Sequence, residues 1–500
     1  MYNRAKNLEL RRAKRLDMIY DDIPILKSIK DYAKSQALPF HMPGHKRGKI
    51  YERLGLSYLL DNLIEMDTTE APGIDNLHNP QGAIMEAQNL AAKTFGADHT
   101  FFLVNGTTSG IYAMIMAATK PGDKILIPRN AHRSVVSGTI LGKLNPIYIM
   151  PEIDTCMGIP MGIKPSTVEK ALEQHPDAKA VLITNPTYHG VCSDIEGISK
   201  VVHDRDKVLL VDEAHGSHFT FHPGLPISAI KAGADMVAQS THKTLPSMTG
   251  SSMLHIRKGS VDIDKLKFFL ELVQTTSPSH VMLASLDLAR YIMEKQGHML
   301  LDECIKYSNI VRNEINARTP FYCLGIEKKG IYGIHDIDPT RITIHLGKGG
   351  ISGIKGEGIL RDRYNIQLEM SDINNVVAIT TVADDEVAYM RLLEAILDIK
   401  RWAVEEDNVY HEARQPNFAP VCEMPPFEAL YHQTEDIDVH RSQGRISAEM
   451  IVPYPPGIPV IMPGEKIDKD IIQYIYQCIN MGMKVNGISD PKFTKIKVIK

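Results

Sequence analysis

A group of hydroxyl residues follows one apolar run in a position that suits the binding of an anion. Residues 101–104 are Phe-Phe-Leu-Val, and Asn-Gly-Thr-Thr-Ser-Gly follows before a further apolar stretch. Hydroxyls and free backbone N–H groups at the N-terminus of a helix stabilise a bound anion such as a phosphate ester. An ordinary helix cap and tight turn use the same residue types, so Gly106, Thr107, Thr108 and Ser109 do not identify a site by themselves.

A carboxylate follows a second apolar run. Asp212 comes directly after Val-Leu-Leu-Val at 208–211, and Glu213, Ala214 and His215 come next. A carboxylate held at the edge of a buried sheet is costly unless a cation faces it, so the sequence predicts a cationic ligand or a metal there. A helix cap or a salt bridge to a neighbouring segment is the alternative.

An amine follows a third apolar run. Residues 236–238 are Met-Val-Ala, and Ser240, Thr241, His242 and Lys243 come shortly after. A lysine amine, with an ordinary pKa of about 10.4, becomes a nucleophile only where burial or a nearby cation lowers that pKa. The adjacent His242 and the position after a strand favour this role, whereas a surface lysine in a polar loop is the alternative.

The three segments together predict a site for pyridoxal phosphate. The phosphate ester of this cofactor needs the helix N-terminus and its hydroxyls, and the aldehyde needs a lysine such as Lys243. The ring nitrogen stays protonated, and so able to accept electrons, only if a carboxylate such as Asp212 pairs with it. No one of the segments is this specific alone.

The elements that must position these residues are predicted by the regular alternation of short apolar runs with helix-like stretches from about residue 100 to 260. Continuous apolar runs are typical of buried parallel strands, whose connections need helices. Open sheets of this kind bind ligands beyond the carboxyl ends of their strands, where the three segments lie. The predicted strands are 101–104, 124–127, 180–183, 208–211 and 236–238, and the first predicted helices are 111–118 and 133–141.

The pattern changes beyond residue 300, where helices at 301–317 and 384–404 accompany alternating strands at 341–346 and 376–381. That mixture is typical of an α+β domain. Proline-rich segments then punctuate the chain from about residue 410. We therefore predict an α/β protein with a helical arm at 1–35, a cofactor-binding large domain at 36–300, a small α+β domain at 301–405 and a C-terminal domain at 406–500.

The composition narrows the class of protein. The chain has 500 residues, more than one compact core usually serves, with 43% hydrophobic and 23% charged residues. Its net charge of −4 argues against a nucleic-acid-coating protein, and no apolar run reaches the roughly 18–20 residues that span a bilayer. Six scattered cysteines suit a reducing compartment. We expect a cytoplasmic protein that binds neither nucleic acid nor membrane.

Several longer segments resemble a known family. The chain resembles the group-III ornithine/lysine/arginine decarboxylases, which are fold-type-I pyridoxal phosphate enzymes, in the short bacterial form that lacks an N-terminal wing domain. The resemblance runs from about residue 30 to the C-terminus. The segments that carry it are PFHMPGHKRG at 39–48, DNLH at 75–78, DEAHG at 212–216, STHK at 240–243, SAE at 447–449, PYPPGIP at 453–459 and PGE at 463–465.

The resemblance implies a role for each site residue. Lys243 would form the Schiff base, Asp212 would pair with the ring nitrogen, His132 would stack on the ring, Ala214 would lie beneath it, and His215 would lie near the reacting carboxylate. Without the resemblance, His132 would be interpreted as a polar loop histidine. The residues expected around the phosphate are Gly106, Thr107, Thr108, Ser109, Ser240 and His242.

The activity implied is the decarboxylation of a basic L-amino acid, arginine to agmatine or lysine to cadaverine, with release of CO₂ into polyamine synthesis. We narrowly favour arginine. Either His242 or Lys243 could return the proton to Cα. Carboxylates should bind the distal cation of the substrate, and the candidates for substrate contact are Glu449, Asp75 and His45. A homodimer or a dimer-based oligomer is expected.

Other interpretations fit the sequence less well. Another fold-type-I activity, such as an aminotransferase or a carbon–sulfur lyase, is disfavoured by the PYPPGIP segment at 453–459. A catalytically silent relative is disfavoured by the intact Asp212, His132 and Lys243. A catalytic metal is not expected, because Pro43 and Gly44 interrupt the pair His41 and His45. Residues 244–250 depart from the small residues found there in some relatives, which leaves the substrate geometry less well defined.

Overall fold

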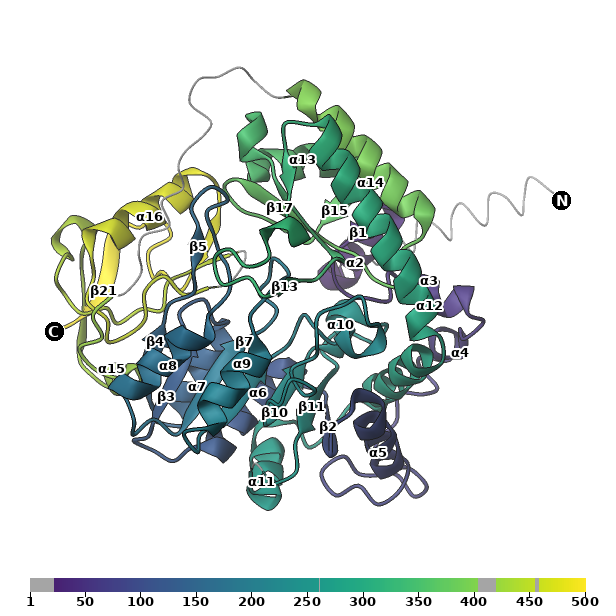
Figure 1. Cartoon of the computed structure of the whole chain (residues 1–500), viewed down its shortest axis with the longest axis horizontal. Helices are drawn as coiled ribbons and strands as arrows, with labels where there is room; N and C mark the ends of the chain where they lie inside the picture. The colour runs from purple at the N-terminus through teal and green to yellow at the C-terminus, as the bar shows by residue number, and fades with distance from the viewer. Residues whose placement is uncertain (1–21, 260, 403–419, 455–457) are drawn as a thin grey trace.

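The computed structural model describes residues 22–259, 261–402, 420–454 and 458–500 (Figure 1). Most of the predicted N-terminal arm lies outside these residues, except for helix α2 (Pro24–Lys34). The middle of the proline-rich PYPPGIP segment lies outside them as well. No helix in the described part of the chain is both long and apolar enough to cross a bilayer.

A seven-stranded sheet forms the centre of the large domain, in the order β2-β11-β10-β9-β7-β3-β4. The strands run parallel except for β11, which is antiparallel to both of its neighbours. This confirms the predicted mainly parallel sheet. The strand bounds are β2 His99–Leu103, β3 Lys124–Pro128, β4 Asn145–Ile149, β7 Ala180–Thr184, β9 Val208–Asp212, β10 Met236–Gln239 and β11 Ser252–Ile256.

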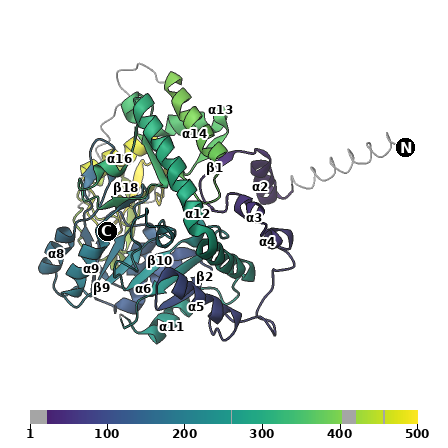
Figure 2. The same ribbon diagram turned by 45° about the vertical axis from the view of Figure 1, so that its right-hand side comes forward.

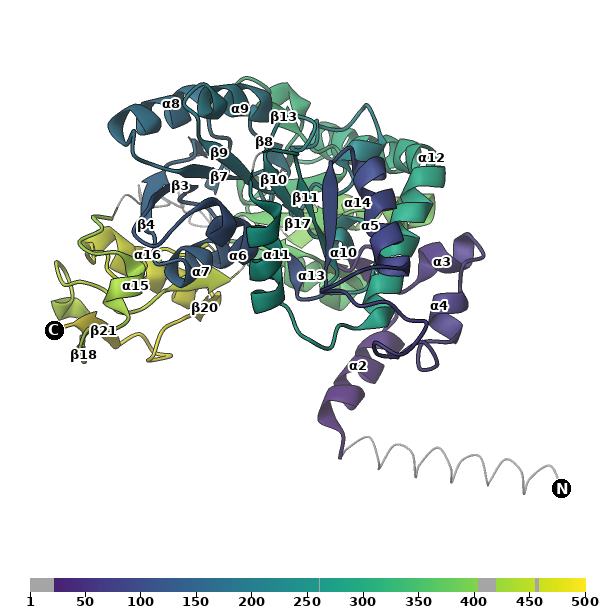
Figure 3. The same ribbon diagram turned by 90° about the horizontal axis from the view of Figure 1, so that it is seen from below.

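Helices cover both faces of this sheet, which explains why the central strands β7, β9 and β10 are nearly continuous apolar runs (Figure 3). On one face, Ile125 of β3 packs with α6 (Gly106–Ala118), α7 (Arg133–Leu141) and α11 (Ile263–Val273). On the other face, Leu126 packs with α8 (Pro165–Gln174) and α9 (Ile195–His203). Helix α6 begins five residues earlier than the predicted 111, so Thr107, Thr108 and Ser109 lie in its first turn.

The small domain is an antiparallel four-stranded sheet with two covering helices. The sheet order is β12-β14-β17-β16. The predicted strands 341–346 and 376–381 correspond to β14 and β17, and the predicted helix 384–404 corresponds to α14. The bounds are β12 Tyr322–Cys323, β14 Arg341–His345, β16 Met370–Ser371, β17 Asn375–Ile379, α13 Gly353–Tyr364 and α14 Glu386–Ile399.

One long helix joins the two domains. Helix α12 (His280–Arg318) has 39 residues and includes the whole predicted helix 301–317. Its first half, with Leu286 and Ile292, packs in the large domain, and its second half, with Val311 and Ile315, packs in the core of the small domain. The predicted division at residue 300 therefore falls inside a continuous helix, which Figure 2 shows lying along both domains.

An N-terminal strand also belongs to the small domain in space. Strand β1 (Leu38–Phe40) pairs in parallel with β15 (Ile366–Leu368). Leu38 and Phe40 are buried in the same core as Ile342 and Leu392. Residues 38–40 therefore pack with residues more than 300 positions away in the sequence, and the segment that follows them passes from the small domain to the large one.

The C-terminal domain lies against the end of the large domain that contains β3 and β4 (Figure 1). Its core surrounds helix α16 and includes Ile461, Ile475 and Phe493. Two short antiparallel pairs complete it, β18 with β21 and β19 with β20. The bounds are α15 Pro426–Ala429, β18 Thr434–Asp438, β19 Val452–Tyr454, α16 Lys469–Asn480, β20 Lys484–Asn486 and β21 Lys495–Ile499.

Candidate active site

A cavity of about 550 Å³ lies at the carboxyl ends of the central strands. It brings together the three segments that the sequence singled out, because parallel strands present their carboxyl ends at one edge of a sheet. The predicted site residues that line it are Gly106, Thr107, Thr108, His132, Asp212, Ala214, His215, Ser240, His242 and Lys243.

Lys243 lies in the short helix α10 (Thr241–Thr244), which directly follows β10. Its Nζ is 3.1 Å from Nε2 of His215. Burial lowers the pKa of Lys243, and the carboxylates of Asp212 and Glu369 oppose that shift. The structure thus provides the desolvated setting that a nucleophilic amine requires.

Asp212 is the last residue of β9 and is only 2% exposed. One of its oxygens accepts the backbone N–H of Ala214 at 3.2 Å. No cation in the described part of the chain lies within ion-pairing distance of this carboxylate. Burial raises the pKa of Asp212, whereas the charge of Lys243 opposes the shift. A buried carboxylate without a protein cation is suited to a cationic group of a ligand.

His132 caps helix α7, and its Nδ1 accepts the backbone N–H of Ser134 at 3.3 Å. Burial, together with the charges of Lys243 and Arg133, lowers the pKa of His132 to about 4. The ring is therefore neutral at pH 7, with its proton on Nε2. A neutral imidazole in the cavity wall can pack flat on an aromatic ligand without repelling a protonated ring nitrogen.

The start of helix α6 forms the predicted anion-binding end of the cavity. The hydroxyls of Thr107 and Ser240 are within hydrogen-bonding distance of each other. Gly106 has φ = +71°, which favours glycine, and its N–H donates to the carbonyl of Gly250 at 2.8 Å. Ser109 differs from its neighbours, because its hydroxyl donates back to the carbonyl of Gly106 at 2.8 Å and does not line the cavity.

The residues present fit pyridoxal phosphate. Asn130 Oδ1, Thr184 Oγ1 and both ring nitrogens of His189 are buried polar atoms without a hydrogen-bond partner among the described residues, and all three residues line the cavity. Unpartnered polar atoms are costly in a protein interior and suit a polar ligand. The cavity also offers a buried amine, a buried carboxylate, a neutral imidazole and clustered hydroxyls, which match the functional groups of the cofactor.

The three candidates for substrate contact do not line this cavity. The carboxylate of Asp75 accepts backbone N–H groups at the start of helix α5 (Ala83–Phe95), including those of Gly82 and Ile84. Partial desolvation opposes the shift, but these hydrogen bonds lower the pKa of Asp75 to about 2. His45 accepts the N–H of Gly48 at 3.0 Å through Nδ1.

Glu449 is buried in the C-terminal domain. Its Oε1 accepts the backbone N–H of Ser489 at 2.9 Å, and its Oε2 has no hydrogen-bond partner among the described residues. Within one chain, Asp75, His45 and Glu449 therefore have structural contacts that do not involve the cavity.

Residues that the sequence analysis did not single out also line the cavity. Thr184 is the last residue of strand β7, Thr187, Tyr188 and His189 come after it, and Asn130 follows β3. The sequence predicts a strand at 180–183. The rule that open parallel sheets bind ligands beyond the carboxyl ends of their strands, which locates Asp212, therefore applies equally to the residues at the end of this strand. Ile458 also lines the cavity, from the C-terminal domain, and it belongs to the PYPPGIP segment at 453–459 that carries the family resemblance.

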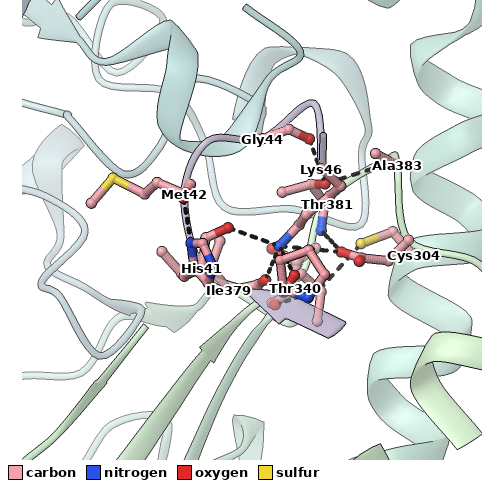
Figure 4. Close-up of polar contacts among 12 residues, drawn as sticks. His41, Met42, Gly44, Lys46, Cys304, Thr340, Ile379, Thr381 and Ala383 are labelled. Atoms are coloured by element: carbon pink, nitrogen blue, oxygen red, sulfur yellow. Dashed lines mark hydrogen bonds and ion pairs between the residues drawn. The ribbon is translucent and has the colours of Figure 1, made fainter. Parts of the chain in front are cut away.

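The segment 41–46, within the HMPGHK motif, connects the cavity to the small domain (Figure 4). Gly44 donates its N–H to the carbonyl of His242 at 2.7 Å and accepts the hydroxyl of Thr381 at 2.8 Å. A Cβ at Gly44 would lie 2.5 Å from the carbonyl oxygen of Leu245, so only glycine fits this close approach. The segment therefore fixes the backbone of α10, which carries Lys243.

Lys46 anchors the same segment. Its Nζ donates to the carbonyls of Pro39 (2.8 Å), His41 (3.1 Å) and Ile379 (2.8 Å) and lies 3.6 Å from Asp384. Burial lowers the pKa of Lys46, and Asp384 opposes that shift. Because three carbonyls use all three donors of an ammonium group, the geometry is that of a charged lysine.

A group of possible metal ligands lies outside the cavity. His222, His298 and Asp302 offer ligand atoms within 4.8 Å of one another. Nδ1 of His222 accepts the N–H of Gly224 at 3.0 Å, and its Nε2 lies 2.9 Å from Asp302. The proton of a neutral His222 is then on Nε2, the nitrogen that would have to bind the metal, so the arrangement suits a hydrogen-bonded cluster better than a metal centre.

Fold and site together define the class of protein, a fold-type-I pyridoxal phosphate enzyme. The family model described as "Orn/Lys/Arg decarboxylase, major domain" matches residues 23–388, and the corresponding C-terminal domain model matches residues 407–490. The chain belongs to the Orn/Lys/Arg decarboxylase family. The predicted family, fold type, cofactor and decarboxylase activity on basic amino acids are confirmed at this level.

Individual relatives agree with this placement. An arginine decarboxylase of Bacillus subtilis is 40% identical over 485 residues, which cover 97% of this chain and 99% of that protein. The lysine decarboxylase LdcA of Pseudomonas aeruginosa is 26% identical, covering 90% of this chain and 75% of that protein. The crystal structure of the Francisella novicida lysine decarboxylase LdcF matches with a TM-score of 0.76 at 24% identity, over 92% of this chain and 78% of that chain.

Proposed function

We propose that arginine is the preferred substrate of this decarboxylase and that Lys243, Asp212 and His132 carry the reaction. The observation that supports the site is that these three side chains line one cavity, with the desolvated amine and the buried carboxylate at the ends of the neighbouring strands β10 and β9. The observation that supports arginine is the 40% identity to arginine decarboxylases over nearly the whole chain.

Each residue has a part that follows from its position. The cofactor supplies an electron sink for the bond that breaks at Cα. Lys243 contributes the amine that holds the cofactor, Asp212 keeps a proton on the ring nitrogen, and neutral His132 packs against the ring. The walls of the cavity exclude water and orient the Cα–carboxylate bond, which selects loss of CO₂ over other reactions at Cα.

The hydrogen bonds of the site favour one of the two candidates, His242 and Lys243, as the residue that returns the proton to Cα. Nδ1 of His242 lies 2.8 Å from the carbonyl of Ser251, so the proton of the neutral ring is on Nδ1. Burial lowers the pKa of His242 to about 4. His242 is thus a poor acid at pH 7, and we favour Lys243 over His242 as the donor.

An adjoining cavity of about 70 Å³ is proposed to receive the substrate side chain. It shares Asn130, Pro160, His189 and Ile458 with the larger cavity and is otherwise mainly apolar. Asp372 lines it and is the carboxylate we propose for the distal guanidinium. A planar guanidinium bonds two carboxylate oxygens at once, whereas an ammonium group makes a single point contact.

Asp75, His45 and Glu449 are retained as proposed substrate contacts only if a second subunit brings them to the cavity. A homodimer is therefore part of the proposal. Helix α2 exposes an apolar face, with Ile25 76% and Ile29 61% exposed, and Figure 2 shows α2 beside α3 (Lys49–Arg53) and α4 (Tyr58–Asp61) on one side of the molecule. An apolar face of this kind suits an interface between subunits.

We also propose that the protein works in the cytoplasm and that its amine product enters polyamine synthesis. All six cysteines are described and none forms a disulfide. Cys192, Cys304, Cys323 and Cys478 are buried. Free thiols throughout the chain are usual for proteins of a reducing compartment.

The test of the substrate proposal is CO₂ release from arginine, lysine and ornithine by the purified holoenzyme, without a keto acid. We expect kcat/KM for arginine to exceed that for the other two by at least about tenfold, equivalent to roughly 1.4 kcal/mol. Equal rates with all three substrates would contradict the preference for arginine. A requirement for a keto acid would instead indicate an aminotransferase.

A further inference from the structure

A buried arginine of the small domain, Arg341, lies behind the residues that line the cavity and contacts one of them. Arg341, in β14, is 2% exposed and does not line the cavity. Its Nη2 lies 3.2 Å from Nδ1 of His215, while its Nε and Nη1 have no hydrogen-bond partner among the described residues. No carboxylate of the described chain lies within ion-pairing distance of it. An incompletely paired buried guanidinium is costly to fold, so its position calls for a function.

The hydrogen bond to His215 determines which nitrogen of that ring carries the proton. A guanidinium has only donors, so Nδ1 of His215 must be the acceptor and cannot carry a hydrogen. Burial, together with the charge of Arg341, holds the pKa of His215 well below its ordinary range, so the ring is neutral. The one proton of the neutral ring is then on Nε2.

The same tautomer constrains Lys243. Nε2 of His215 lies 3.1 Å from Nζ of Lys243, and an Nε2–H group needs an acceptor there. A neutral amine offers a lone pair, whereas an ammonium group offers only donors. The chain Arg341–His215–Lys243 is therefore consistent only with an unprotonated Lys243, which is the nucleophilic form.

The other charged and titratable groups around Arg341, His215 and Lys243 do not change the protonation states assigned to these residues. Asp212 and Glu369 raise the pKa of Lys243, and His132 and His242 lower that of His215. The charge of Arg341 lowers the pKa of Asp338, but the Oδ1 atom of Asp338 accepts the hydroxyl of Thr340, and its Oδ2 atom lies 3.2 Å from Nε2 of His218 rather than within ion-pairing distance of Arg341. Tyr188 places its ring edge-on to His215 with a centroid distance of 4.7 Å, and its hydroxyl donates to Glu369.

We propose that Arg341 is a positioning residue that fixes the Nε2–H tautomer of His215 and thereby holds the amine of Lys243 in its reactive, unprotonated form. This inference rests on the proposed function, in which Lys243 is the amine that takes up the cofactor. It differs from a structural role, because a buried arginine that only filled space would affect stability without affecting the protonation of Lys243.

The test measures uptake of the cofactor by the apoprotein, without turnover. Wild-type apoprotein and Arg341→Met are mixed with pyridoxal phosphate between about pH 6 and pH 10, around the ordinary range of a lysine. Borohydride reduction and peptide mass spectrometry then quantify uptake at Lys243. We expect the pH of half-maximal rate to rise by at least about one unit in Arg341→Met, a tenfold loss of reactive amine at a given pH, and Arg341→Lys to recover part of the shift.

A double-mutant cycle separates the tautomer from simple charge. In a His215→Phe background, which has no imidazole and so no tautomer, Arg341→Met should shift the pH of half-maximal uptake by less than about a third of the shift it causes when His215 is present. An equal shift in both backgrounds would mean that Arg341 acts by charge alone and would overturn the proposal. No shift in either background would also overturn it.

Two further measurements complete the test. Arg290→Met removes another buried arginine, which pairs with Asp287 and Glu294 on helix α12 rather than with His215, and it should lower stability without moving the uptake profile. A shift as large as that of Arg341→Met would indicate general loosening and would count against the proposal. In ¹⁵N-histidine spectra of the wild-type apoprotein, a protonated Nδ1 on His215 would refute it directly. If wild-type Lys243 takes up no cofactor, both this inference and the proposed site fail.

Discussion

At the scale of single residues, Asp212 is the group whose environment most clearly requires a ligand. It is buried at a strand end and forms no ion pair within the described part of the chain, so a cationic group of a ligand would compensate its charge. Two neighbouring carboxyl groups thus differ sharply in role. Glu213 is also buried, but it points away from the cavity, where its oxygens accept N–H groups of Gln239 and Ala229, both at 2.7 Å.

Asp212→Asn should lower kcat by at least about 100-fold, the usual loss when one preorganised electrostatic group is removed from a reacting centre. The apoprotein should be no less stable than the wild type, because the substitution removes a buried unpaired charge. The control is Glu213→Gln. Glu213 does not line the cavity, so this substitution should lower stability, because one N–H group loses its acceptor, but should retain most of the activity. Similar losses in both variants would show that the two positions act through packing.

His255, on β11, supplies a test of how burial controls protonation. Burial lowers the pKa of His255 to about 3. The unfolded chain binds a proton near pH 6.5 and the folded chain does not, so the stability contributed by neutral His255 is present above pH 6.5 and is lost as the pH falls toward 3. The expected loss between pH 7 and pH 5 is about 2 kcal/mol.

His255→Gln should therefore remove part of the acid sensitivity of the apoprotein. The measurement is the urea midpoint at pH 7 and pH 5 in both proteins, since glutamine can still donate to Gln239, as Nε2 of His255 does at 3.1 Å. The variant should lose less on acidification than the wild type does. An unchanged difference between the two pH values would mean that other groups cause the acid sensitivity.

At the scale of elements, the segment 41–46 couples the small domain to the helix that carries Lys243. Removing the ammonium group of Lys46 would take a donor from three carbonyls and the counter-charge from Asp384, which would keep only the N–H of Thr381 (Figure 4). Breaking a buried ion pair on one side typically costs 3–5 kcal/mol. Lys46→Met should thus lower the thermal midpoint and also kcat/KM, because Gly44 bonds the carbonyl of His242.

The matched control is Lys49→Met, three residues away and exposed. It should leave both the thermal midpoint and kcat/KM nearly unchanged. Adding Asp384→Asn to Lys46→Met should recover part of the lost stability, because the uncompensated carboxylate is then gone. A double variant as unstable as the single one would contradict the ion-pair explanation.

Most of the elements could be predicted from the sequence because their signals are local. The strands that end at Asp212 and before Lys243 were apolar runs bounded by polar residues, and both were found within one residue. The sequence predicts only the second half of helix α12, because the two halves pack in different domains and so do not share one continuous apolar face. The pairing of β1 with β15 joins residues far apart in sequence, for which periodicity gives no signal.

The residues of the candidate site also differ in this respect, because some have a local sequence signal and others are brought to the site only by the tertiary structure. Lys243, Asp212 and the hydroxyls of α6 follow strands, so the rule for strand ends located them. Arg341 lies within an apolar strand of another domain, and only the tertiary structure brings it to His215. Asp75 was selected as a carboxylate in a family motif, whereas its hydrogen bonds to Gly82 and Ile84 show that it supports the start of α5 within one chain.

At the scale of the whole molecule, one buried ion pair ties the C-terminal domain to the large domain. Arg129, three residues before His132, forms a bidentate pair with Glu465 and also donates to the carbonyl of Val460 at 3.1 Å. Both side chains are almost fully buried, at 4% and 0% exposure. The PGE motif at 463–465 therefore has a physical role, which is to hold the C-terminal domain against the cavity wall.

Glu465→Gln should loosen that attachment, since it leaves Arg129 buried without a counter-charge at a cost of about 3–5 kcal/mol. Amide hydrogen exchange should speed up in α16 and in the β18–β21 pair, and activity should fall because Ile458 lines the cavity. The control is Glu435→Gln, whose pair with Arg445 is at the surface and should matter little. Unchanged exchange in the C-terminal domain would contradict this account of its attachment.

The measurement that tests the central claim most directly is the location of the cofactor on the chain. Purified holoenzyme is reduced with borohydride and digested, and the pyridoxyl group is located by mass spectrometry. The account predicts that the group is on Lys243, the desolvated lysine that lines the cavity. A pyridoxyl group on another lysine, such as the more deeply buried Lys46, or its absence from a protein that still releases CO₂, would contradict the account.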